Sequence, residues 1–232
     1  KWVPHTLTPL QKQDRFDACA EHYERSQAEG LAFLHSIITG DESWLYVYDP
    51  QTKQQASAWK SPGDMRDPIE RKGRFTGKVL LTLFFDAEGV VYHRYHPAGD
   101  TITANVYMDV LKSVVDAVRR KRPALVQNGW SLLHDNARAH MATKVQEFIH
   151  RNNIAVINHP AYSPDLAPCD FFLFSQLKLP LRGRRFKTVK ELTTASDAVL
   201  RDLSKNGFQH VFERLSDRWK RCIDSDGDYV QK

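Results

Sequence analysis

Apolar residues recur at two different spacings along the chain, and the change in spacing separates predicted helices from predicted strands. Over 9–26 they return about every fourth position, which predicts an amphipathic helix with Thr8 as its N-cap, and a short second helix is predicted over 29–34. Over 37–48 the residues are mainly β-branched and aromatic, so this segment is predicted as a strand with Asp41 inside it.

The remainder of the chain predicts an alternation of strands and helices. An apolar run over 78–85 predicts a strand buried on both faces, and a turn at 86–89 leads into a neighbouring strand at 90–92. Further strands are predicted over 130–133 and 154–157, and helices over 103–122, 138–151, 168–178, 190–203 and 209–223. Antiparallel neighbours followed by strand–helix–strand crossovers predict an α/β fold with a mixed five-stranded sheet flanked by helices, which is the outline of an RNase H-like fold.

A polar stretch from about 51 to 74 interrupts this pattern, and Trp59 stands out in it as a large apolar residue. We interpret the stretch as a long insertion outside the core. The first residue is Lys1 rather than Met, which suggests a fragment of a longer protein.

The composition excludes some classes of protein and leaves others open. With 232 residues the chain is long enough for one large domain, and no run of eighteen apolar residues indicates a membrane span. The three cysteines are widely separated, so neither a disulfide framework nor a zinc knuckle is supported, and a reducing compartment is expected. The net charge of +5 is compatible with a polyanionic partner but does not by itself indicate one.

Three aspartates fall at informative places in the predicted sheet. Asp41 lies inside the first strand, Asp135 directly after the fourth, and Asp170 in the first turn of the helix after the fifth. Ligands gather at the carboxyl ends of parallel strands, so the three side chains are expected to converge. Clustered carboxylates can hold two divalent ions for phosphodiester chemistry, and oxygen ligands suit Mg²⁺.

Each aspartate also has a structural alternative. Asp135 is a plausible N-cap, and Asp170 is favoured near a helix N-terminus by the macrodipole. Asp41 is harder to explain in this way, because a carboxylate in an apolar strand is costly without a partner. Its neighbour Glu42 points to the other face of the strand and is expected to be exposed or structural.

Several motifs in a fixed order resemble the catalytic region of the mariner-type transposases across essentially the whole chain. The matching pieces are Trp2-Val3-Pro4-His5, Gly40-Asp41-Glu42-Ser43-Trp44, His134-Asp135-Asn136-Ala137, the stretch 162–171, and Arg218-Trp219 with Cys222. The family has three catalytic aspartates with thirty-four residues between the second and third, and residues 136–169 are 34 in number here. The resemblance therefore assigns catalysis and metal binding to Asp41, Asp135 and Asp170. Some host-domesticated relatives carry asparagine at the third position, whereas this sequence keeps Asp170.

The resemblance also implies a domain organisation and a dimer. Residues 1–30 are expected to form a linker and N-terminal helix region, and 31–232 an RNase H-like catalytic domain with a clamp loop at about 51–74. In the family the linker of one subunit packs against the clamp loop of the other, which implies a homodimer and assigns this contact to Trp2, Val3, Pro4, His5 and Trp59. Thr6 stands where the family usually has an acid. The helix-turn-helix modules that read the transposon ends are expected to be missing from this fragment.

Two basic clusters are candidates for contacts with DNA phosphates. The first follows the predicted helix that carries Asp170, and it comprises Arg182, Arg184, Arg185, Lys187 and Lys190. The second is the run 119–122, for which a solvated helix face is the favoured interpretation. His134 and His140 flank the second aspartate and are not assigned as metal ligands.

The activity that the resemblance implies is metal-dependent cleavage at transposon inverted-repeat ends, followed by transfer of the 3′-hydroxyl into target DNA at TA. Mg²⁺ is the expected cofactor, Mn²⁺ is expected to substitute, and the nucleus is the expected location, with no membrane partner. Two alternatives stay open: a catalytically silent, domesticated module for DNA binding and dimerisation, and a stand-alone RNase H-like nuclease.

Overall fold

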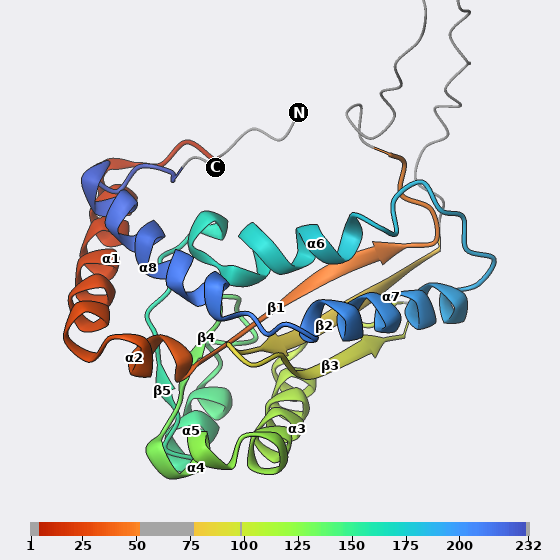
Figure 1. Ribbon diagram of the computed structural model, residues 1–232, viewed down its shortest axis with the longest axis horizontal. Coiled ribbons are helices and arrows are strands. Elements are labelled where there is room, and N and C mark those ends of the chain that lie inside the picture. Colours follow the sequence, from red (N-terminus) through yellow and green to blue (C-terminus); the bar gives the residue numbers. More distant parts are fainter. Residues whose placement is uncertain (1–4, 52–76, 98, 231–232) are drawn as a thin grey trace, which may run out of the picture.

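A five-stranded sheet with the order β3-β2-β1-β4-β5 forms the centre of the molecule (Figure 1). The computed structural model describes residues 5–51, 77–97 and 99–230. The strands are β1 (Ile37–Tyr46), β2 (Lys78–Phe85), β3 (Val90–His96), β4 (Ser131–Leu133) and β5 (Ala155–Val156). The first three pair antiparallel, whereas β4 is parallel to β1 and to β5. The predicted mixed sheet of five strands is confirmed.

Helices cover both faces of this sheet, with α3, α4 and α5 on one side and α6, α7 and α8 on the other (Figure 1). Their bounds are α1 (Pro9–Glu29), α2 (Leu31–His35), α3 (Ala104–Lys121), α4 (Pro123–Asn128), α5 (Thr143–Arg151), α6 (Phe174–Lys178), α7 (Val189–Ser204) and α8 (Gln209–Asp224). Two short segments, the 3₁₀ helix η1 (Pro164–Leu166) and the π-helix η2 (Cys169–Leu173), precede α6. Thr8 caps α1 as predicted, because its hydroxyl accepts a hydrogen bond from the Gln11 amide at 3.2 Å.

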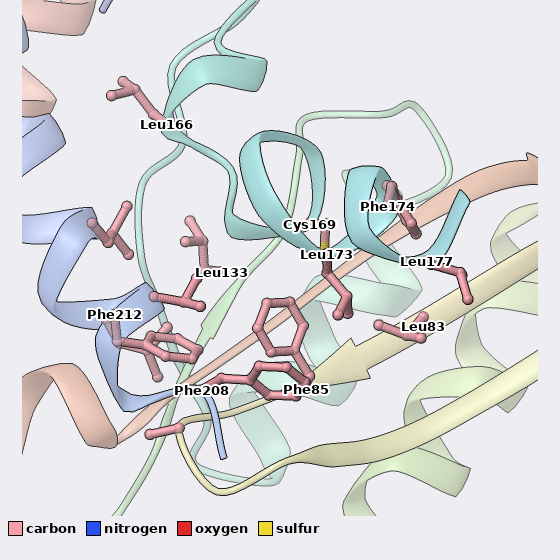
Figure 2. Packing of buried hydrophobic residues seen from close by; sticks show 14 of the residues in the cluster. Leu83, Phe85, Leu133, Leu166, Cys169, Leu173, Phe174, Leu177, Phe208 and Phe212 are labelled. Atoms are coloured by element: carbon pink, nitrogen blue, oxygen red, sulfur yellow. The ribbon is translucent and has the colours of Figure 1, made fainter. Parts of the chain in front are cut away.

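Each face of the sheet carries its own hydrophobic core, since neighbouring residues of a strand point to opposite faces. Phe84 packs with α3 and α5, whereas Phe85 packs with η2 and α8 on the other face. Figure 2 shows the second core, in which side chains of η2, α6 and α8 gather over β2. This two-sided burial explains why β2 is apolar at nearly every position.

Gly40 brings β1 and β2 into close contact next to the first candidate aspartate. A Cβ atom at this position would lie 2.2 Å from Cε1 of Phe84. Phe84 is fully buried and its ring fills the space that any larger residue would need. The glycine before Asp41 is therefore required by packing.

The structure corrects two predicted helices. The helix predicted over 138–151 begins only at Thr143, because residues 138–141 form turns. The helix predicted over 168–178 is divided into η2, with its wider π-helical turns, and α6. Pro123 ends α3 as expected, but it also opens the unpredicted α4, because proline is tolerated at the first position of a helix.

The basic run 119–122 has structural contacts rather than a purely solvated face. Arg122 forms an ion pair of 2.6 Å with Asp86, whose side chain is almost completely buried. The Lys121 ammonium group donates hydrogen bonds to the carbonyl groups of Val90 and Val91 on β3. Among the described residues, no helix is both long enough and apolar enough to cross a membrane.

Candidate active site

Asp41, Asp135 and Asp170 line one open cavity of about 460 Å³. Asp41 lies midway along β1, Asp135 lies two residues after the end of β4, and Asp170 lies in the first turn of η2. β1 and β4 are parallel neighbours, and η2 packs against β1, so three separate elements bring the carboxylates together. The structure thus shows the expected convergence, whereas the catalytic roles of the three residues stay a prediction.

The electrostatics of the cavity disfavour negative charge on two of the three carboxylates. Burial raises the pKa of Asp41 to about 8, with a further contribution from the charge of Asp170. Burial also raises the pKa of Asp170 to about 6, although the positive charge of Lys178 opposes this shift. Ionisation of both carboxylates is therefore unfavourable in the absence of a cation, and a nearby cation would favour the ionised forms.

Asp135 behaves differently because a histidine contacts it. Its burial is outweighed by the hydrogen bond from His140, so the pKa of Asp135 lies below its usual value. His140 Nδ1 lies 2.7 Å from Asp135 Oδ1. The carboxylate accepts a second hydrogen bond from the Ala137 amide, in a turn rather than at the start of a helix. The N-cap alternative for Asp135 is therefore wrong, since α5 begins eight residues later at Thr143.

The donor chemistry of this cavity fits a hard divalent cation, because carboxylate oxygens are preferred ligands of Mg²⁺ and Mn²⁺. Burial and, to a smaller extent, the charge of Asp170 raise the pKa of Asp41, and a cation bound between the carboxylates would favour the ionised form. Within the described ranges, no group of three or more His, Cys, Asp or Glu side chains is already placed to hold a metal ion.

A buried arginine, which the sequence analysis did not single out, fixes the loop that leads to Asp170. Arg15 of α1 is completely buried, and its guanidinium group forms two hydrogen bonds with Asp165, of 2.9 and 2.8 Å. It also donates to the Ser163 hydroxyl and to the Gly227 carbonyl. A signal was present in the sequence, since Arg15 lies four residues before Cys19 on the buried face of α1.

Comparison with known proteins identifies the family. The family described as "Transposase (partial DDE domain)" matches residues 49–128. The Mariner Mos1 transposase of Drosophila mauritiana is 32% identical over 233 residues, which cover all of this chain and 66% of the relative. The solved catalytic domain of Mos1 mariner transposase is 30% identical with a TM-score of 0.82, and the match covers 99% of this chain and 100% of that domain.

The chain belongs to the mariner-type transposases.

It corresponds to the catalytic core of a metal-dependent DNA transposase, and the match to the Mos1 catalytic domain confirms the RNase H-like fold. The chain spans 66% of the length of the Mos1 protein. A Mos1 paired end complex with Mn has a TM-score of 0.90 at 33% identity, covering 100% of this chain and 67% of that one. The alternatives of a silent module and a stand-alone nuclease are not favoured by these matches.

The predicted linker is described only at its last residue. The His5 imidazole stacks on the ring of Tyr162, with 4.2 Å between ring centroids. Tyr162 lines the cavity of the three aspartates and has a φ of 56°, a left-handed conformation that is rare for an aromatic residue. The remaining predicted linker and clamp residues, Trp2, Val3, Pro4 and Trp59, lie outside the described residues, as does most of the predicted clamp loop.

The first basic cluster does not contribute to the lining of the cavity. None of Arg182, Arg184, Arg185, Lys187 and Lys190 belongs to the described lining of the cavity. The cluster follows α6, where the Phe186 amide donates to the Val47 carbonyl just beyond β1. Arg182 is 3.4 Å from Asp49, whereas Lys187 and Lys190 are exposed.

Proposed function

We propose that this core cleaves phosphodiester bonds at transposon ends and joins the freed 3′-hydroxyl group to target DNA at a TA dinucleotide. The convergence of Asp41, Asp135 and Asp170 on one open cavity carries this proposal. Mg²⁺ is the proposed metal, and Mn²⁺ is expected to substitute. Divalent ions in such a site activate the attacking oxygen and stabilise the charge on the leaving oxygen.

The three aspartates are proposed to coordinate two metal ions in different ways. The charges of Asp170 and Asp135 both contribute to the raised pKa of Asp41, which supports a central position in contact with both ions. Asp135 and Asp170 approach the cavity from different elements, so each is proposed to hold one ion. The cavity is open to solvent, as access for a DNA strand requires.

The DNA partner and the dimer are proposed from the relatives. Solved structures of the Mos1 transposase are described as paired end complexes with Mn and with Mg, and as a strand transfer complex. We infer a homodimer that holds two transposon ends, with Arg184, Arg185, Lys187 and Lys190 contacting phosphates and Arg182 supporting them. The nucleus is the proposed location, since the chromosomal target lies there.

Nicking of supercoiled plasmid DNA tests the proposed chemistry without knowledge of the end sequence. The chain is expected to nick the plasmid in Mg²⁺ or Mn²⁺ but not in EDTA. It is also expected to join an oligonucleotide 3′-hydroxyl to TA sites. Asp41→Asn, Asp135→Asn and Asp170→Asn should each reduce nicking to the protein-free level.

Asp116→Asn is the matched control, because Asp116 is an exposed residue of α3 that pairs only with nearby Arg119 at 3.4 Å in the described contacts. This variant should nick as fast as the wild type. If the three cavity variants also retain wild-type nicking, the assignment of the catalytic residues is wrong. Size-exclusion chromatography with light scattering, on the chain with and without DNA, tests the dimer.

A further inference from the structure

His140 is a buried residue whose ring contacts Asp135 at two atoms, one in the carboxylate and one in the backbone carbonyl group. Its Nδ1 atom lies 2.7 Å from Asp135 Oδ1 and 3.2 Å from the Asp135 backbone oxygen. Only 1% of the His140 side chain is exposed, whereas half of the Asp135 side chain is exposed. A buried group thus contacts a half-exposed carboxylate that lines the open cavity.

Two further elements contact the His140 ring, by stacking on one face and by an ionic contact at Nε2, which has no hydrogen-bond partner among the described residues. Tyr107 of α3 stacks on it with 3.8 Å between ring centroids, and the Tyr107 hydroxyl lies 2.7 Å from His134 Nδ1. Glu42 of β1 places its Oε2 atom 3.7 Å from His140 Nε2. The other oxygen of Glu42 accepts a hydrogen bond from the Thr82 hydroxyl at 3.2 Å. The expectation that Glu42 is exposed is therefore wrong, and its structural alternative is confirmed.

Asp135 depends on these contacts because its own segment gives it little support. It follows a strand of only three residues and precedes a series of turns. Within the described residues, its carboxylate has two hydrogen-bond partners, the Ala137 amide and His140, and both contact Oδ1. In the described contacts the second oxygen, Oδ2, has no hydrogen-bond partner, and Asp135 is one of the residues that line the cavity.

We propose that His140 is a positioning residue that, held by Glu42 and Tyr107, fixes the Asp135 carboxylate with one oxygen directed at a divalent cation. The proposal rests on the proposed function, in which Asp135 is a metal ligand. Groups that hydrogen-bond to a ligand orient it, and their loss typically weakens metal affinity by about 10–100-fold.

Titration of the chain with Mn²⁺, followed by the EPR signal of the free ion, measures this effect without any DNA. His140→Ala is expected to weaken Mn²⁺ binding about 10–100-fold. His140→Asn is expected to recover most of the affinity, because the asparagine amide nitrogen occupies nearly the place of the histidine Nδ1 atom and donates a similar hydrogen bond. Tyr107→Phe keeps the stacked ring and should change the affinity less than His140→Ala.

His150→Ala is the matched control, since His150 is an exposed histidine of α5. It should bind Mn²⁺ like the wild type, and circular dichroism should show that every variant is folded.

Asp135→Asn separates the positioning role of His140 from the proposed function. If it loses affinity while His140→Ala does not, the positioning role is overturned and the proposed function stands. If Asp135→Asn binds Mn²⁺ as tightly as the wild type, Asp135 is no ligand and both fail. Equal weakening in the alanine and asparagine variants of His140 also overturns the proposal.

Discussion

Asp41 is placed where its own charge opposes folding of the metal-free protein. Its carboxyl group lies in a partly buried position on β1 and shares a cavity with two other carboxylates. Burial, followed by the charge of Asp170, raises its pKa from 3.8 to about 8. A buried carboxylate whose ionisation is disfavoured does not stabilise the core. The position of Asp41 therefore favours a functional role over a structural one.

Replacement of Asp41 by asparagine should stabilise the metal-free protein at alkaline pH. Because the folded-state pKa lies above the unfolded value, the folded state binds more protons between about pH 4 and pH 8. Wild-type stability should therefore fall as pH rises through this window, whereas Asp41→Asn should escape this fall. One pKa unit corresponds to about 1.4 kcal/mol, and solvent in the open cavity reduces the gain to the order of 2 kcal/mol at pH 8.

Urea unfolding in EDTA at pH 5 and pH 8 measures this difference. The gain of the variant over the wild type should be larger at pH 8. Addition of Mn²⁺ should stabilise the wild type more than the variant. An equal difference at both pH values would contradict the electrostatic explanation.

At the scale of single elements, β1 is the strand that connects both cores to the site. Its first residues pack into the two cores, and its middle carries Gly40 and Asp41. The absence of a side chain at Gly40 allows the Phe84 ring of β2 to lie against β1. The shape of the strand beside the first aspartate is therefore set by packing on the opposite face of the sheet.

Gly40→Ala should destabilise the protein by about 1–3 kcal/mol, as expected for an overpacked core. The new methyl group would lie 2.2 Å from the Phe84 ring, which is fully buried and must move. Phe84→Leu should cost stability alone but should relieve the clash in the double variant. Chemical denaturation of both single variants and the double variant measures the coupling, and strictly additive losses would show that the ring does not cause the effect.

Sequence patterns predicted well the elements in which the spacing of apolar residues matches the spacing of buried positions. The apolar run of β2 and the helical repeats of α3 and α8 extend over many residues, and their predicted bounds agree with the structure to within one residue at each end. The segment 138–142 was predicted wrongly because its residues favour a helix locally. In the structure the chain turns there, and His140 reaches back to Asp135. No local pattern encodes that contact.

At the scale of the whole molecule, one ion pair joins segments from both ends of the chain to the loop before Asp170. Arg15 pairs with Asp165, and the Asp165 carboxylate also accepts a hydrogen bond from the Val230 amide at 2.8 Å. The Arg15 guanidinium donates to the Gly227 carbonyl. The sequence predicted the three aspartates through family motifs, but it could not predict this pairing, because the partners are about 150 residues apart.

Arg15→Met should destabilise the protein by about 3–5 kcal/mol, since it leaves the Asp165 carboxylate partly buried without its cation. Lys12→Met is the matched control on the same helix. Lys12 pairs with Asp228 at the surface, where side-chain exposures are 38% and 52%, and exposed pairs contribute at most about 1 kcal/mol. Urea denaturation at neutral pH measures both, and equal losses would contradict the special role of Arg15.

The Arg15 contact also sets an order of events during synthesis. Arg15 and Gly227 are 212 residues apart, so a ribosome adding about 5–20 residues per second needs roughly 10–40 s to produce the second after the first. During that time the loop before Asp170 lacks its C-terminal contacts. The segment around Gly227 can therefore stabilise the loop before Asp170 only once nearly all of the described residues have been synthesised.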